Sequence, residues 1–125
     1  MPPILLLVPA LELLGLLGFI HLASTSVEPS LRYLPLVAAA ITVVLLFTRE
    51  AGSMTLRQLA VSAALLSLLV VAAFQGLGFV FPGLAKDVDP ISFANVVRLA
   101  VILAIAIAAH GGALAVCHYL RRRRR

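Results

Sequence analysis

Long apolar stretches alternate with short polar segments along the whole sequence. Three of the stretches reach the roughly 20 apolar residues that a helix needs to cross a hydrocarbon core about 30 Å thick. The second stretch is shorter, but it still spans if its flanking arginines extend their charged ends to the lipid surface. The pattern predicts an all-α polytopic membrane protein with one domain, residues 1–125. Its four transmembrane helices are expected at about 4–23, 33–48, 56–81 and 91–120.

Composition supports this class and limits the chemistry. Hydrophobic residues make up 62% of the chain and charged residues 12%, which is too little polar surface for a water-soluble domain of this size. We find no nucleotide-binding loop, metal-ligand cluster or set of nucleophile and base. We therefore expect no enzyme activity, no catalytic residue and no metal site. The three histidines lie at different depths of their helices, so we also expect no haem within one chain and no other cofactor.

The positive charges predict the orientation. Arginine and lysine in short loops stay on the cytoplasmic side of a membrane. In a four-helix zigzag, Arg49, Arg57 and five C-terminal arginines share one side, and Arg32, Lys86 and Arg98 share the other. Both termini are therefore expected to be cytoplasmic, in the plasma (inner) membrane. Anionic lipid head groups, and not nucleic acid, are the expected partners of the C-terminal run. That run is Arg121, Arg122, Arg123, Arg124 and Arg125.

The two halves of the sequence share short similarities. Leu-Gly-Phe-Ile at residues 17–20 is followed about 60 residues later by Leu-Gly-Phe-Val at 77–80, with weaker matches continuing to residue 90. Either a duplication of a helical hairpin or chance recurrence of common apolar residues explains them. If the duplication is real and the N-terminus is cytoplasmic, the two hairpins run in the same sense and form a parallel repeat.

Glu12 is the most informative polar residue. It lies near the middle of the first helix, where an ionised carboxylate costs on the order of 3 kcal/mol. Gly15 and Phe19 share its helix face, and the glycine lets a neighbouring helix approach closely. We therefore expect Glu12 to point inward. His110 lies at a similar depth in the fourth helix and is its candidate partner, either in a structural hydrogen bond or in a proton-exchanging pair.

The fourth helix also carries small residues at four-residue spacing, on the face opposite His110. Small residues allow close contact between helices in a membrane. Two opposite faces of one helix are thus predicted to make contacts, and we expect a partner membrane protein or a second copy of the chain to supply one of them. The small residues of this predicted packing face are Ala100, Ala104, Ala108 and Gly112.

In layout, the chain resembles the small multidrug resistance exporters, which have four helices, a similar length and a glutamate in the middle of the first helix. The resemblance implies an exchanging role for Glu12. The sequence departs from that family in its strong charge bias and in lacking the family's aromatic substrate residues in the third helix.

Two functional hypotheses follow. In the first, the protein is a small non-catalytic accessory or assembly subunit of a larger membrane complex, with Glu12 and His110 as internal contacts. In the second, it is a homo-oligomeric proton- or ion-coupled transporter in which Glu12 exchanges a proton for substrate. The first accounts for the fixed orientation, the minimal loops and the absence of catalytic motifs.

Overall fold

The computed structural model describes residues 2–80 and 93–124, and every regular element in these ranges is helical. Four of the helices are long and apolar enough to cross a membrane, as the hydropathy pattern predicts. Three short 3₁₀ turns accompany them: η1 (Pro3–Leu6), η2 (Pro29–Tyr33) and η3 (Ala51–Ser53). The four long helices are α1 (Leu7–Ala23), α2 (Leu34–Glu50), α3 (Leu56–Val80) and α4 (Phe93–Arg123).

The helix ends differ slightly from the expected ones. Helix α2 runs two residues beyond the predicted end, and α4 continues three residues beyond residue 120 into the arginines. A helix can extend past the apolar stretch because its backbone hydrogen bonds do not require lipid. The predicted end of the third helix at 81 and start of the fourth at 91 lie outside the described residues.

Prolines mark the starts of helical segments. Pro3 and Pro29 stand at the beginnings of η1 and η2, and Pro35 lies in the first turn of α2. Proline fits the first turn because the N–H that it lacks would have no partner inside the helix there. The polar turn before α2 is thus built from residues that favour a helix start.

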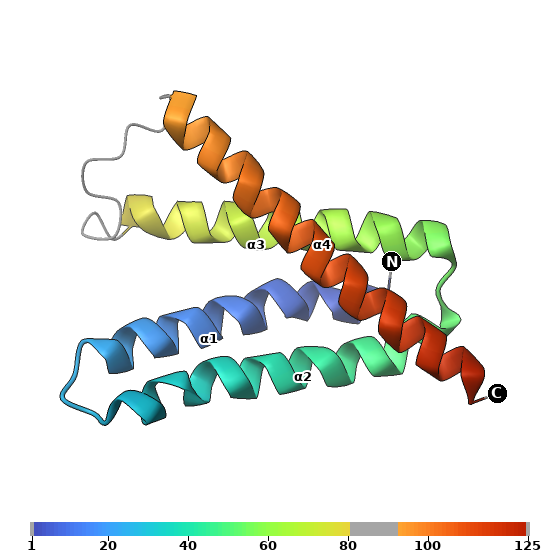
Figure 1. The fold of residues 1–125 in the computed structure, drawn as a ribbon, viewed down its shortest axis with the longest axis horizontal. Helices are drawn as coiled ribbons and strands as arrows, with labels where there is room; N and C mark the ends of the chain where they lie inside the picture. Colours follow the sequence, from blue (N-terminus) through green and yellow to red (C-terminus); the bar gives the residue numbers. More distant parts are fainter. Residues whose placement is uncertain (1, 81–92, 125) are drawn as a thin grey trace.

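Helices α3, α1 and α2 lie side by side, with α1 between the other two, and α4 crosses over them (Figure 1). Helix α1 packs on α2 and α3, whereas α4 packs on α3, α2 and η3. Direct packing between α1 and α4 is slight, so these two helices meet mainly through individual side chains.

Close packing of α1 on α2 depends on two glycines. A Cβ atom on Gly15 would lie 2.8 Å from the Cβ of Ala39 and 3.2 Å from the carbonyl oxygen of Pro35. A Cβ on Gly18 would lie 2.7 Å from the Cβ of Pro35. The prediction that the Gly15 face of α1 admits a neighbouring helix at short distance is therefore confirmed, and α2 is that neighbour.

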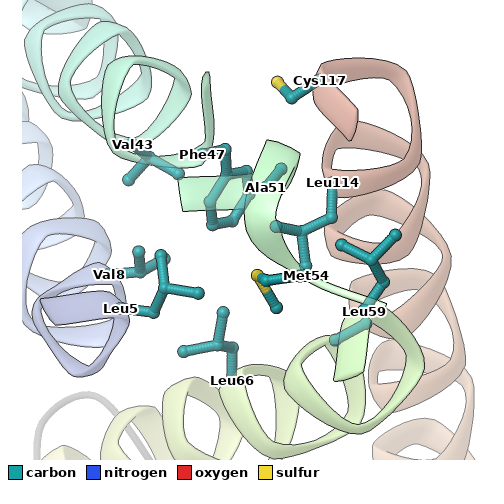
Figure 2. Close-up of a cluster of buried hydrophobic side chains, with 11 residues drawn as sticks. Leu5, Val8, Val43, Phe47, Ala51, Met54, Leu59, Leu66, Leu114 and Cys117 are labelled. Carbon is teal, nitrogen blue, oxygen red and sulfur yellow. The ribbon is translucent and has the colours of Figure 1, made fainter. Parts of the chain in front are cut away.

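The buried core gathers at the end of the bundle that holds η3 (Figure 2). Phe47, Leu5 and Met54 are its largest fully buried side chains. All four helices contribute to it, and Leu114 and Cys117 bring the second half of α4 into the cluster. The bundle is therefore held most tightly at this end.

A hydrogen bond and a close packing contact hold the same end of α4 in place. The Nδ1–H of His118 donates to the carbonyl oxygen of Ala51 at 2.7 Å. A Cβ on Gly52 would overlap the side chain of Arg121, so glycine allows the last turns of α4 to lie against η3. The first half of α4 differs, because no residue from 96 to 109 is buried.

Some sequence predictions concern features that the described residues do not show. Lys86, and the weaker matches of the second half at residues 84–90, lie outside the described residues. The duplication of a hairpin and the orientation in the membrane therefore stay predictions.

We predict that Gly15→Ala destabilises the bundle by about 1–3 kcal/mol, because the added methyl group overpacks the α1–α2 contact. Gly76→Ala is the matched control, since no atom of the described residues lies within 4 Å of its added Cβ and alanine has a higher helix propensity than glycine. Thermal unfolding in detergent can be followed by dye labelling of Cys117, the one cysteine, which is buried. A Gly15→Ala protein as stable as Gly76→Ala would contradict the prediction.

Candidate functional site

Glu12 of α1 and His110 of α4 are in contact. The Oε1 atom of Glu12 lies 2.6 Å from the Nε2 atom of His110. The side chain of His110 is 9% exposed and that of Glu12 is 27% exposed, so both face inward as predicted. The hydrogen bond links the two helices that have little other direct packing.

The second ring nitrogen fixes the tautomer of His110. Its Nδ1 atom lies 2.9 Å from the carbonyl oxygen of Ala106, which can only accept a hydrogen bond. The Nδ1 atom is also 3.0 Å from the Oγ of Ser67, whose hydroxyl donates to the carbonyl oxygen of Ala63 at 2.7 Å. We therefore assign the proton to Nδ1, from which it is shared between Ala106 and Ser67.

This tautomer leaves one proton between Glu12 and His110. Since Nδ1 already carries a proton, the 2.6 Å bond requires a second proton on either Nε2 or Oε1. Without it, a carboxylate would face the lone pair of Nε2. If Nε2 and Oε1 both carried a proton, the pair would place a net positive charge among apolar side chains. The pair is thus a neutral unit that holds a single shared proton.

Ser67 belongs to the site and is absent from the sequence-based candidates. It lies near the middle of α3, is fully buried and accepts from His110. The one feature of the sequence that points to Ser67 is a hydroxyl group near the middle of an apolar helix. That signal is weak, because a serine can satisfy itself by donating to the carbonyl four residues earlier, as Ser67 does to Ala63.

A pocket of about 420 Å³ adjoins the Glu12–His110 pair. Helices α2 and α4 form most of its walls, with contributions from α1 and α3. Among the described residues, the two paired residues supply its only ionisable groups. The other lining residues are apolar: Leu16, Leu36, Ala39, Ala40, Val43, Val44, Phe47, Val70, Ala106, Ala109 and Ala113.

The other predicted positions lie away from this pocket. Ala100, Ala104, Ala108 and Gly112 are all exposed, on the side of α4 that faces away from the bundle. No atom of the described residues lies within 4 Å of a Cβ placed on Gly112. The C-terminal arginines are exposed where described, namely Arg121, Arg122, Arg123 and Arg124, and Arg125 lies outside the described residues.

Within residues 2–80 and 93–124, no three histidine, cysteine, aspartate or glutamate side chains come together in a way that could hold a metal ion. Comparison of the chain with protein families, with curated proteins and with solved structures finds no match. The arrangement of its own residues is therefore the basis for a functional proposal.

We predict that Ser67→Ala lowers the stability of the protein by about 0.5–1.5 kcal/mol, because it removes one acceptor of the His110 Nδ1–H. Ser62→Ala is the matched control. Ser62 is fully buried on the same helix, and its hydroxyl has no partner among the described residues, so its loss should be neutral or stabilising.

Dye labelling of Cys117 during thermal unfolding measures the stability of both serine variants. Nitrogen-15 shifts of labelled histidine provide a separate test, with Nδ1 of His110 expected to be protonated in the unmodified protein. Equal melting temperatures for the two variants, or a deprotonated Nδ1, would show that the assigned network is wrong.

Proposed function

We propose that the protein is a non-catalytic assembly subunit of a larger membrane complex, which docks on another membrane-spanning chain through the outer face of α4. The observation that carries the proposal is the exposure of the small-residue face formed by Ala100, Ala104, Ala108 and Gly112. In lipid, apolar side chains gain little by leaving the bilayer, so association depends on close backbone approach at small residues.

The packing of α4 supports this proposal. Only four residues of this 31-residue helix are buried within the described chain: Asn95, His110, Leu114 and Cys117. Among the described residues, the outer face is thus left open from Ala100 to Gly112, while the core and η3 hold the C-terminal half in place. A partner helix can approach this face without displacing a contact between described residues.

In this proposal, the Glu12–His110 hydrogen bond is an internal structural contact. It joins α1 to the inner side of α4 at 2.6 Å and so fixes the rotation of α4 about its own axis. The rotation matters because it determines which face of α4 points outward. We further propose that both termini are cytoplasmic and that the exposed C-terminal arginines bind anionic head groups, at about 1 kcal/mol each.

We predict that Ala104→Leu removes the partner from the purified complex, because a large side chain prevents close helix approach. Ala60→Leu is the matched control, since Ala60 is an exposed alanine on α3, away from the proposed face. Purification in mild detergent with quantitative mass spectrometry should show at least a tenfold loss of the companion subunit for Ala104→Leu alone. A companion retained equally by both variants would contradict docking through α4, and a homo-oligomer lost only in Ala104→Leu would make the partner a second copy.

The pocket favours a second candidate function, a proton-coupled carrier. What supports it is that the hydrogen bond between Glu12 and His110 lies beside a space of small-molecule size. A carrier needs the proton of that bond to leave and return during each cycle, whereas a structural subunit needs it to stay.

Glu12→Gln separates the two functions. The amide N–H of glutamine can donate to Nε2 of His110 and keep the hydrogen bond, but glutamine cannot release a proton. For an assembly subunit, we expect partner recovery within twofold of the unmodified protein and unchanged activity of the complex. A variant that still assembles but no longer releases protons on ligand addition to reconstituted vesicles would favour the carrier.

A further inference from the structure

We propose that the pocket between α2 and α4 binds a neutral, mostly apolar molecule that carries one hydroxyl group, and that the hydroxyl donates to Glu12. This inference rests on the pocket and its polar pair, not on the outer face of α4. It would also name the substrate class of the second candidate function. Failure of ligand binding would leave docking through α4 untouched.

The chemistry of Glu12 determines which ligand groups fit. Its Oε1 atom is engaged with His110, and its Oε2 atom has no hydrogen-bond partner among the described residues. The shared proton lies in the bond between Oε1 and Nε2, so Oε2 is an acceptor whether the pair is acid and imidazole or carboxylate and imidazolium. A ligand group that faces Oε2 must therefore donate.

A donor is needed here because the bilayer core supplies no water to satisfy the oxygen. A hydroxyl group meets that need, whereas a ketone, ether or ester presents only acceptors. A cationic group would add a net charge to a neutral pair among apolar walls, which disfavours an ammonium ligand. A neutral alcohol or phenol therefore satisfies both conditions, with a single donor and no charge.

The apolar walls of the pocket suit the apolar part of such a ligand. They also leave the pocket accessible from the bilayer. Ala40 and Val44 of α2 and Ala109 of α4 line the pocket and are exposed on the bundle surface. A molecule dissolved in the bilayer can therefore enter sideways between the two helices. Apolar contacts alone would hardly distinguish the pocket from surrounding lipid, so the hydrogen bond decides occupancy.

Photolabelling of the full-length protein in phosphatidylcholine vesicles tests the proposal. The probe is an octanol that carries a diazirine on its alkyl chain, and its methyl ether is the matched probe without a donor. We expect the alcohol to label pocket-lining peptides about fivefold more than the ether, the factor that one hydrogen bond supplies. Equal labelling by both probes, or none at the pocket, would overturn the inference.

Substitutions test where the probe is bound and whether Glu12 is the acceptor of its hydrogen bond. Glu12→Gln keeps a carbonyl acceptor and should retain the preference for the alcohol, whereas Glu12→Leu should abolish it. A preference that is lost in Glu12→Gln would show that the carboxyl group itself is required and would overturn the acceptor role. Ala40→Phe fills the pocket and should reduce alcohol labelling at least fivefold, and it decides the question if Glu12→Leu does not fold.

Ala38→Phe is the control for added bulk, because Ala38 is exposed on the same helix but does not line the pocket. Alcohol labelling that falls equally in Ala38→Phe and Ala40→Phe would place the label outside the pocket and contradict the inference. Burial of Cys117, measured by dye labelling, verifies that each variant is folded.

Discussion

The hydrogen bond between Glu12 and His110 is the interaction on which the arrangement of this bundle depends. In the interior of a membrane, a carboxyl group and an imidazole each cost several kcal/mol unless a partner satisfies them. Each residue is that partner for the other, and Ser67 completes the network by accepting from the far side of the ring. One chain of polar contacts thus connects α1, α4 and α3, although α1 and α4 have little direct packing.

The network also separates the two faces of α4. Its inner side is committed to His110, Leu114 and Cys117, and this leaves the small residues on the outer side. The same helix therefore contributes a polar group to the pocket and a row of small residues to its outer face. The proposed docking and ligand functions use different faces, so they are separable by substitution and compatible in one protein.

Close packing at one place and looser packing at another create the pocket. Gly15 and Gly18 draw α1 against α2, and the core around Phe47 holds the bundle together at the η3 end. Away from this end, α4 crosses over the other helices (Figure 1). Small side chains such as Ala39 and Ala40 line the space beside the polar pair. A neutral pair that shares one proton can remain at the edge of such an apolar space without a counter-ion.

The sequence by itself determined the class and the four helices, because the thickness of a bilayer dictates the length of each apolar stretch. It also predicted that Glu12 faces inward, since a carboxyl group is costly in lipid, and that the small residues of α4 lie opposite His110, since helical geometry fixes their angles. Only the tertiary structure decided that Glu12 and His110 touch, that Ser67 joins them and that a pocket adjoins them. Helix order leaves open which helices become neighbours, and a serine that bonds to its own helix gives no signal of a further partner.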